Sequence, residues 1–382
     1  MQVCSRYKVS TMRCWSVELL CPSFIISVLV SCWAGCCPSV VYEATATEPT
    51  VRLPLDEAPH ECGGFEWWYY TGRVASDDGL GYGVEAVIFR VPRIPLGILG
   101  EVWIAHYAVL DESTGDFTYD QVRFLGPSLL ARVTHAGFDL RTPLVQITGS
   151  QGQDHLRAAM SDGSYALDLM LGDERGAVVH GSGGYVLYGT AGPAFYYSRP
   201  RMQATGTIQI AGRPQSVSGY VWFDRQWGRN LTNPWLNWDW FSLRLEDGPD
   251  VMLFVLHEED GPTLGGTYIP SDGESYPLAA DDFSVTPTSW WTSPHTGIRY
   301  PAAWRIQVIP QELKLTVVAV AEDQELDARP TTLNVYWEGL CSVTGTHGDQ
   351  SVDGHAYVEL ANYPRGSGVG PGWAAHSVMG HR

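Results

Sequence analysis

Apolar and polar residues alternate with a period of two along most of this chain from residue 65 onward. FEWWYYTGRV, YGVEAVIFRV and VSGYVWFD are examples, rich in β-branched and aromatic residues and bounded by Gly, Pro, Asp or Asn. This composition and alternation predict β-strands whose successive side chains point to opposite faces of a sheet. The same pattern recurs in VWIAHYAVL, YALDLML, TGTIQI, WDWFSLRL, VMLFVL, WRIQVI, LKLTVVAV, TLNVYWEG and GHAYVELANY.

Helical spacing of apolar residues does not persist in this region for more than about two turns. Many short strands with frequent turn signals therefore predict an all-β protein built as a sandwich or a barrel. The pattern breaks at residues 229–234 (RNLTNP), which predicts two domains, at 61–232 and 233–365. A Gly-rich stretch opens residues 366–382, which we expect to form a flexible tail.

The first 31 residues have the character of a targeting segment. Three cations precede the apolar run LLCPSFIISVLV, whose length of about 12 residues suits a signal peptide and is too short to span a bilayer. The tetrapeptide LVSC resembles a lipobox, so we expect lipidation of Cys32, with residues 32–60 as a tether. The alternative is a plain signal peptide cleaved near Ala34. Either way the sequence predicts export, and the lipobox predicts a periplasmic or outer-membrane-anchored lipoprotein.

The formal net charge of −18 argues against a nucleic-acid partner, because Lys and Arg hold a phosphate backbone. Of the eight cysteines, only Cys62 and Cys341 lie in the predicted body, and their pairing stays open. The sequence contains no Cys/His cluster with zinc spacing, no Walker loop and no dinucleotide fingerprint, so we expect neither metal nor cofactor.

Carboxylates set among large aromatic residues are the main candidates for chemistry. They are Glu66 in EWWYY, Asp224 in YVWFDRQWG and Asp239 in WDWF. A carboxylate surrounded by Trp and Phe is poorly solvated, so we expect a raised pKa, which suits a general acid. The alternative is that these carboxylates form buried ion pairs with an arginine (Arg73, Arg225 or Arg244).

Strand periodicity assigns these residues to faces. Glu66, Trp68 and Tyr70 should share one face of their strand, and Trp222 and Asp224 should share one face of theirs.

His106, in AHYA, lies in the middle of a predicted strand and is either a further proton-transfer candidate or a hydrogen-bonded core residue. The absence of GxSxG and HExxH motifs leaves nucleophilic and metal-assisted hydrolysis without support.

Several segments together resemble the AttH/CrtC-like lipocalin family, which includes proteins labelled secreted hydrolases and the carotenoid 1,2-hydratases. They are FEWWYYTGRV, AHYAVLDESTGDFTYDQ, YYSRPRMQATGTI, SGYVWFDRQWG, NWDWFSLRLEDGPDVMLFVL, YPAAWRIQVIP, VYWEGLCSVTG and GHAYVELANY, from about residue 61 to 363. The resemblance implies two consecutive lipocalin-like antiparallel β-barrels that bind an apolar ligand.

In the hydratases of that family an Asp is thought to protonate an isolated C=C bond, and Asp224 occupies the matching position. The resemblance thus implies Asp224 as the acid, with Glu66, His106 and Asp239 as candidate partners. The expected ligand-binding aromatics are Trp68, Tyr70, Tyr197, Trp222, Trp227 and Trp240.

Three functions stay open at this point. One is a hydratase-type enzyme acting on an isoprenoid- or polyketide-like molecule, and another is a non-catalytic carrier lipoprotein for such a molecule. The third is a structural envelope protein whose barrels are filled by their own side chains.

Overall fold

The computed structural model describes residues 50–60, 64–91, 101–126, 137–228, 236–246 and 248–365. The predicted signal segment with Cys32, Cys62, the predicted boundary at 229–234 and the predicted tail at 366–382 lie outside these residues. Cys341 lies inside them, as a buried thiol in a sheet core.

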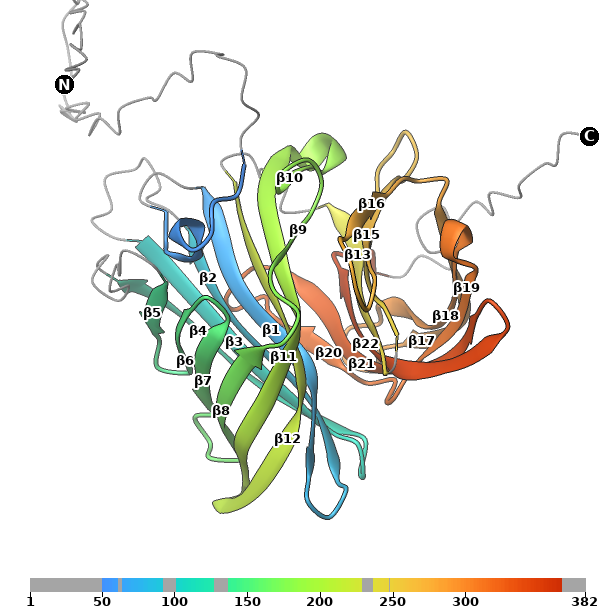
Figure 1. Ribbon diagram of the computed structural model, residues 1–382. Coiled ribbons are helices and arrows are strands. Elements are labelled where there is room, and N and C mark those ends of the chain that lie inside the picture. The colour runs from blue at the N-terminus through green and yellow to red at the C-terminus, as the bar shows by residue number, and fades with distance from the viewer. Residues whose placement is uncertain are drawn as a thin grey trace, which may run out of the picture. The chain divides into compact units, whose positions relative to one another are not determined.

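Two antiparallel β-sheets form the described body (Figure 1). The strands of sheet one are β1 (Phe65–Ser76), β2 (Gly81–Val91), β3 (Glu101–Asp111), β4 (Asp116–Gly126), β5 (Phe138–Arg141), β6 (Val145–Ser150), β7 (Gln153–Ala159), β8 (Tyr165–Asp173), β9 (Val178–Val179), β10 (Tyr185–Leu187), β11 (Pro193–Ile210) and β12 (Arg213–Gly228). Those of sheet two are β13 (Asn237–Leu245), β14 (Asp250–His257), β15 (Thr263–Ile269), β16 (Tyr276–Leu278), β17 (Phe283–Thr292), β18 (Arg299–Val308), β19 (Leu313–Ala319), β20 (Glu325–Asp327), β21 (Val335–His347) and β22 (Gln350–Ala361).

Short 3-10 helices η1 (Leu55–Glu57), η3 (Gly189–Ala191) and η4 (Ile309–Gln311) accompany the strands. Within the described ranges, no helix has both the length and the apolar character that crossing a membrane requires.

Both sheets repeat one topology. Sheet one has the order β4-β3-β2-β1-β12-β11-β8-β7-β6-β5, with β9 and β10 beside β11. Sheet two has the order β16-β15-β14-β13-β22-β21-β19-β18-β17, with β20 beside β21. In each, the last long strand returns to pair with the first, which curls the sheet into a half-barrel. The prediction of an all-β fold with two consecutive lipocalin-like barrels is confirmed.

The burial patterns of the strands show where the two sheets pack together. Strand β8 alternates between buried and exposed residues, as expected for a strand with one face in solvent. Strand β2 is buried along almost its whole length. The reason is that β1 packs against β22 and β2 against β21, so the outer faces of these strands are covered too.

The three largest of the apolar clusters in the described residues show how this packing is arranged. One fills the interior of sheet one around Trp68 and Trp103, and a second fills the interior of sheet two around Trp304 and Trp337. A third lies between the sheets and includes Trp240. We use the term intersheet layer for the side chains that lie between the outer face of sheet one and the strands of sheet two that cover it, among them Trp240.

Residues 50–60, expected to belong to a tether, instead pack on sheet one. Arg225 Nη2 donates to the carbonyl of Ala58 at 3.1 Å, and Arg90 Nη1 donates to the carbonyl of His60 at 2.8 Å. The end of the predicted tether is therefore part of the fold.

Candidate functional site

Strand register places a row of side chains across the outer face of sheet one. Ser198 pairs with Asp224, Asp224 with Tyr69, Tyr69 with Val87, and Val87 with His106. These residues share a face because paired residues on neighbouring strands point to the same side of a sheet. The row lies in the intersheet layer, where sheet two covers it.

Asp224 is held by three donors in this layer. Tyr196 Oη donates to Oδ2 at 2.8 Å, Trp222 Nε1 donates to Oδ1 at 2.7 Å, and Ser198 Oγ donates to the same Oδ1. Trp240 Nε1, from sheet two, donates to Tyr196 Oη at 3.1 Å and links the sheets at this point.

Burial raises the pKa of Asp224 to about 7, and the three donors offset only part of that effect. Asp224 thus meets the expectation of a raised pKa and holds its proton near neutrality. The predicted shared face of Trp222 and Asp224 is confirmed by their hydrogen bond.

A second chain of hydrogen bonds leads away from Asp224. His180 Nε2 lies 2.7 Å from Ser198 Oγ, and His180 Nδ1 lies 2.8 Å from Thr267 Oγ1 of sheet two. Burial lowers the pKa of His180 to about 3, so the ring is neutral. A neutral imidazole has one donor and one acceptor nitrogen, so it can join the two hydroxyls in one direction towards Asp224.

Three further carboxyls lie in the intersheet layer. Glu338 and Glu359 are paired on β21 and β22, and Tyr69 Oη of sheet one donates to Glu338 Oε2 at 2.6 Å. Glu85, on β2, is fully buried. Burial raises the pKa of Glu85 and of Glu359 to about 8 and that of Glu338 well above its usual range. Repulsion adds to this effect, from Glu359 on Glu85 and Glu338, and from Asp224 on Glu359. Neutral carboxyl groups therefore lie side by side in this part of the intersheet layer.

We predict that Glu85→Gln stabilises the protein at alkaline pH. Because the pKa of Glu85 in the fold lies above its usual value of 4.5, the native state holds a proton that the unfolded chain releases. The presence of Glu85 therefore lowers the unfolding free energy progressively as the pH rises from about 4.5 to 8. Glutamine does not ionise, so the substitution removes this loss of stability. Since each unit of pKa difference corresponds to about 1.4 kcal/mol, we expect a gain of up to about 5 kcal/mol in unfolding free energy at pH 9 and almost none at pH 5.

Urea unfolding at pH 5, 7 and 9 measures this effect, with the exposed Glu259→Gln as the control. A stability gain from Glu85→Gln that is equal at all three pH values would contradict the raised pKa.

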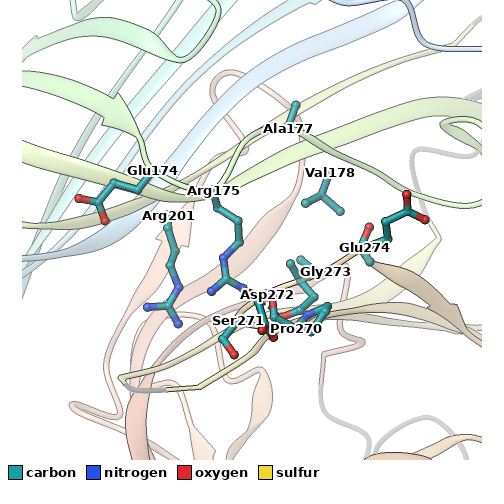
Figure 2. Close-up of a pocket in the computed structure, with 12 residues that line it drawn as sticks. Glu174, Arg175, Ala177, Val178, Arg201, Pro270, Ser271, Asp272, Gly273 and Glu274 are labelled. Carbon is teal, nitrogen blue, oxygen red and sulfur yellow. Dashed lines mark hydrogen bonds between the residues drawn. The ribbon is translucent and has the colours of Figure 1, made fainter.

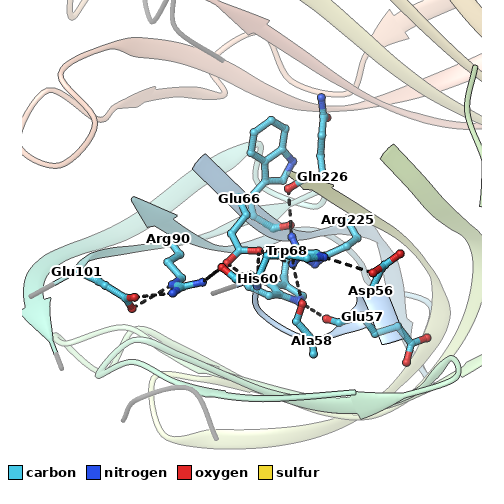
Figure 3. A network of polar contacts seen from close by, with 11 residues as sticks. Asp56, Glu57, Ala58, His60, Glu66, Trp68, Arg90, Glu101, Arg225 and Gln226 are labelled. Carbon is cyan, nitrogen blue, oxygen red and sulfur yellow. Dashed lines mark hydrogen bonds and ion pairs between the residues drawn. The ribbon is translucent and has the colours of Figure 1, made fainter. Parts of the chain in front are cut away.

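Glu66 belongs to a different network, at one end of sheet one (Figure 3). Its carboxylate pairs with Arg225 Nη2 and with Arg90 Nη1, each at 2.5 Å, and with His60 Nδ1 at 3.1 Å. Burial alone would raise the pKa of Glu66, but Arg225, His60 and Arg90 together lower it to about 2. The expectation of a raised pKa is wrong for Glu66, and the alternative of a buried ion pair with Arg225 holds.

The remaining proton-transfer candidates occupy separate environments. His106 bonds Tyr336 Oη through Nδ1 and lies 2.8 Å from Thr331 Oγ1 through Nε2, and burial lowers its pKa to about 3. His106 is therefore a neutral, hydrogen-bonded core residue, which is the second of the two interpretations that the sequence left open. Asp239 lies in sheet two, where Tyr363 Oη donates to its Oδ1 at 2.7 Å and His257 Nε2 lies 3.2 Å away.

The strands and faces on which they lie keep the four predicted catalytic residues, Asp224, Glu66, His106 and Asp239, apart. Glu66 shares the inner face of β1 with Trp68 and Tyr70, as predicted, whereas Asp224 pairs with Tyr69 on the outer face. The expected ligand-binding aromatics divide in the same way. Trp68, Tyr70, Tyr197 and Trp227 line the interior of sheet one, and Trp222 and Trp240 lie in the intersheet layer.

Sequence reasoning missed His180, Glu85, Glu338 and Glu359. Each glutamate is a lone carboxylate in an apolar strand segment, in VEAVIF, YWEGL and YVELA, which is the signal that singled out Asp224. His180 follows the two-residue strand β9 and carried no comparable signal.

A groove with a volume of about 680 Å³ opens close to the hydrogen-bonded residues around Asp224. Figure 2 shows side chains that line it. The segment after β8 and the loop after β15 line it, and Arg175 Nη1 crosses between them to donate to the carbonyls of Ile269 and Pro270, at 3.1 and 2.8 Å. Val178 lines the groove and pairs with Ser198. The groove wall thus includes the strand partner of Ser198, which donates to Asp224, and the groove's volume falls in the usual range for small-molecule sites.

Within the described ranges, no group of three or more His, Cys, Asp or Glu is arranged to hold a metal ion. What the intersheet layer offers chemically is a set of buried, neutral carboxyls among Trp and Tyr rings, with Asp224 the best supplied with hydrogen-bond donors.

Comparisons with known proteins agree with this fold. The chain resembles the structure of a protein assigned as an AttH from Nitrosomonas europaea, with 26% identity and a TM-score of 0.73 over 83% of this chain and 98% of that one. It also resembles kievitone hydratase from Nectria haematococca in fold, with 21% identity and a TM-score of 0.63 over 83% of this chain and 94% of that one.

No sequence among the curated proteins matches the chain. The model of the family described as AttH-like matches residues 44–363. Together with the two curled half-barrels, that match over most of the chain identifies the protein as a member of the AttH-like family.

Proposed function

We propose that this protein adds water to a carbon–carbon double bond of a hydrophobic, isoprenoid- or polyketide-like molecule, with Asp224 as the acid. The observation that carries the proposal is a fully buried carboxyl that three donors orient and that holds its proton near pH 7. Kievitone hydratase, a protein of similar fold, is by its name a hydratase, and this analogy also supports the proposal.

The reaction can be written with this chain's own groups. The π electrons of the substrate take the proton from Asp224, which forms a C–H bond and leaves a carbocation beside the carboxylate. Water then forms the C–O bond, and the proton that it releases returns to Asp224. The faces of Trp222 and Trp240 in the same layer would stabilise the cation, since aromatic faces attract positive charge.

The remaining groups of the site would assist this step. Tyr196, Ser198 and Trp222 would stabilise the carboxylate that forms when the proton leaves. The groove beside Val178 would admit the substrate. Export, and anchoring through Cys32 to a membrane from which an apolar substrate could be drawn, are part of the same proposal.

Two measurements test the proposal against carriage of an unchanged ligand. Native mass spectrometry of protein purified from its own host identifies the retained apolar molecule, which is then returned to ligand-free protein in ¹⁸O-labelled water. We expect a product heavier by one molecule of labelled water. Recovery of the molecule unchanged would replace catalysis by carriage, and recovery of no apolar molecule would favour a structural role.

Access through the groove gives a further prediction. Val178 is 7% exposed and faces the groove, whereas its neighbour Val179 is 39% exposed and points away. A tryptophan at position 178 should obstruct the way to Asp224 and lower kcat/KM by about tenfold or more, while the same change at 179 should leave it unaltered.

Steady-state kinetics of Val178→Trp and Val179→Trp with the substrate identified above measures the difference. Circular dichroism verifies that both variants fold. Equal activity of the two variants would place the entrance elsewhere.

A further inference from the structure

A second, much smaller cavity reaches the intersheet layer at a different place. Its volume is about 30 Å³, and the buried residues among those that line it include Thr71, Trp222, Ser242 and Tyr357. None of these residues lines the 680 Å³ groove, whose walls are the segment after β8 and the loop after β15. The layer therefore has a wide approach and a narrow one, formed by different elements.

Unpartnered polar atoms lie just behind the narrow cavity. Both carboxyl oxygens of Glu85 and the hydroxyl of Thr71 are fully buried, and no donor or acceptor in the described chain bonds them. Thr71 pairs with Glu85 on one side and with Trp222 on the other, so the three side chains form a row on the outer face of sheet one. That row neighbours the one that holds Asp224.

A buried polar group destabilises the folded protein unless it forms a hydrogen bond. A buried hydroxyl or carboxyl without a partner costs about 1–3 kcal/mol, and such groups in folded proteins generally bond ordered water. A space of about 10–15 Å³ suffices for one water molecule, so this cavity has room for one or two.

We infer that the narrow cavity is the inlet through which water enters the intersheet layer, and that Thr71 and Glu85 hold that water beside the Asp224 site. The inference rests on the proposed function, since it supplies the second reactant of the hydration. In the reaction above, this water provides the oxygen of the new C–O bond, and its proton passes to the Asp224 carboxylate.

The chemistry of the cavity favours water over other small occupants. Arg73, Arg244 and His355 line its outer part, which disfavours a metal cation or an ammonium ion. An organic molecule of substrate size does not fit the volume. Separate entrances would also keep bulk water away from the carbocation until the organic substrate is in place.

The inlet can be tested without any substrate, by the rate at which the Glu85 carboxyl exchanges its proton for deuterium. Infrared difference spectra of the full chain against Glu85→Gln isolate the Glu85 carboxyl band, and transfer into D₂O at pH 6 starts the exchange. Ser242→Leu fills the cavity, so we expect exchange to slow by about tenfold or more. The exposed Ser218→Leu on β12 serves as the matched control and should exchange at the wild-type rate.

Thr71→Val is the second variant, because it keeps the shape of the side chain and removes only the hydroxyl. High-resolution crystal structures should show an ordered water within hydrogen-bond distance of Thr71 Oγ1 and Glu85 in the wild type, and no water there in the valine variant. If the Glu85 proton exchanges at the wild-type rate in Ser242→Leu, or if the wild-type crystal shows no water at this site, the inference of a water inlet is wrong.

These outcomes are independent of the test of catalysis. If ¹⁸O enters a product but Ser242→Leu exchanges normally, the hydration stands and the inlet falls. If exchange slows but no product forms, the cavity admits water to a site that does not hydrate.

Discussion

Asp224→Asn should slow turnover by orders of magnitude while leaving the fold intact. The substitution keeps the size of the side chain and its place beside Tyr196 and Trp222, but the amide is far too weak an acid to protonate a carbon atom. General acids contribute on the order of 10²- to 10⁴-fold to a rate, and we expect kcat to fall by that amount. Product analysis with the host-derived substrate measures the fall, and thermal unfolding verifies folding.

The pH profile of the wild type gives an independent check. Because Asp224 must be protonated to act, kcat should decline as pH rises through about 7. Ser198→Ala removes one donor to the carboxylate and keeps the acid, so it should move that decline to higher pH. An Asp224→Asn variant that turns over at the wild-type rate would remove Asp224 from the chemistry.

Arg225→Met should be the most destabilising single substitution at the ion-pair network. Arg225 is fully buried, pairs with Glu66, donates to the carbonyl of Ala58 and lies 3.8 Å over the ring of Trp68. Removing one partner of a buried pair leaves the other charge uncompensated, at a cost of about 3–5 kcal/mol. Urea unfolding at pH 7 measures the loss.

The exposed pair of Arg141 and Asp139 provides the matched control. Arg141→Met should leave the unfolding free energy almost unchanged, because solvent screens that pair. Hydrogen exchange gives a second readout of Arg225→Met, since residues 50–60 lose one of their anchors and should exchange faster. Equal losses for the two arginines would show that the buried network does not stabilise the fold.

The pH dependence of the Glu66 network has the opposite sign to that of Glu85. The pKa of Glu66 in the fold is lowered to about 2, so the network stabilises the protein fully above pH 4.5 and loses this contribution as pH falls towards 2. Glu85 destabilises the native state as pH rises towards 8. Together, these two carboxyls favour a stability maximum in mildly acidic solution.

The contrast between these two glutamates shows where sequence reasoning stops. Both are lone carboxylates in aromatic or apolar strands, and the alternation correctly assigned Glu66 to the face of Trp68 and Tyr70. The pKa of a buried carboxyl depends on which cations reach it, and Arg90 and Arg225 come from strands β2 and β12. Strand pairing brings them to Glu66, and period-two alternation carries no information about pairing partners.

The same limit explains the candidates that did not come together. Asp224, Glu66, His106 and Asp239 were grouped by residue type, but a sheet has two faces and this protein has two sheets. His106 and Asp224 share one row, separated by two strands, or roughly 15 Å at the usual strand spacing. Glu66 lies on the inner face of sheet one, opposite to that row, and Asp239 lies in sheet two.

By itself the sequence determined the all-β class, the strands and the faces of their side chains, because alternation is a local property of the chain. It also marked Asp224, together with Glu66 and Asp239, as a carboxylate among aromatic residues and a candidate acid. Only the tertiary structure decided that the outer face of sheet one is covered, because β21 and β22 come from the other half of the chain. That covering buries Asp224 and Glu85 away from bulk solvent, raises their pKa values and turns the strand surface into a candidate site.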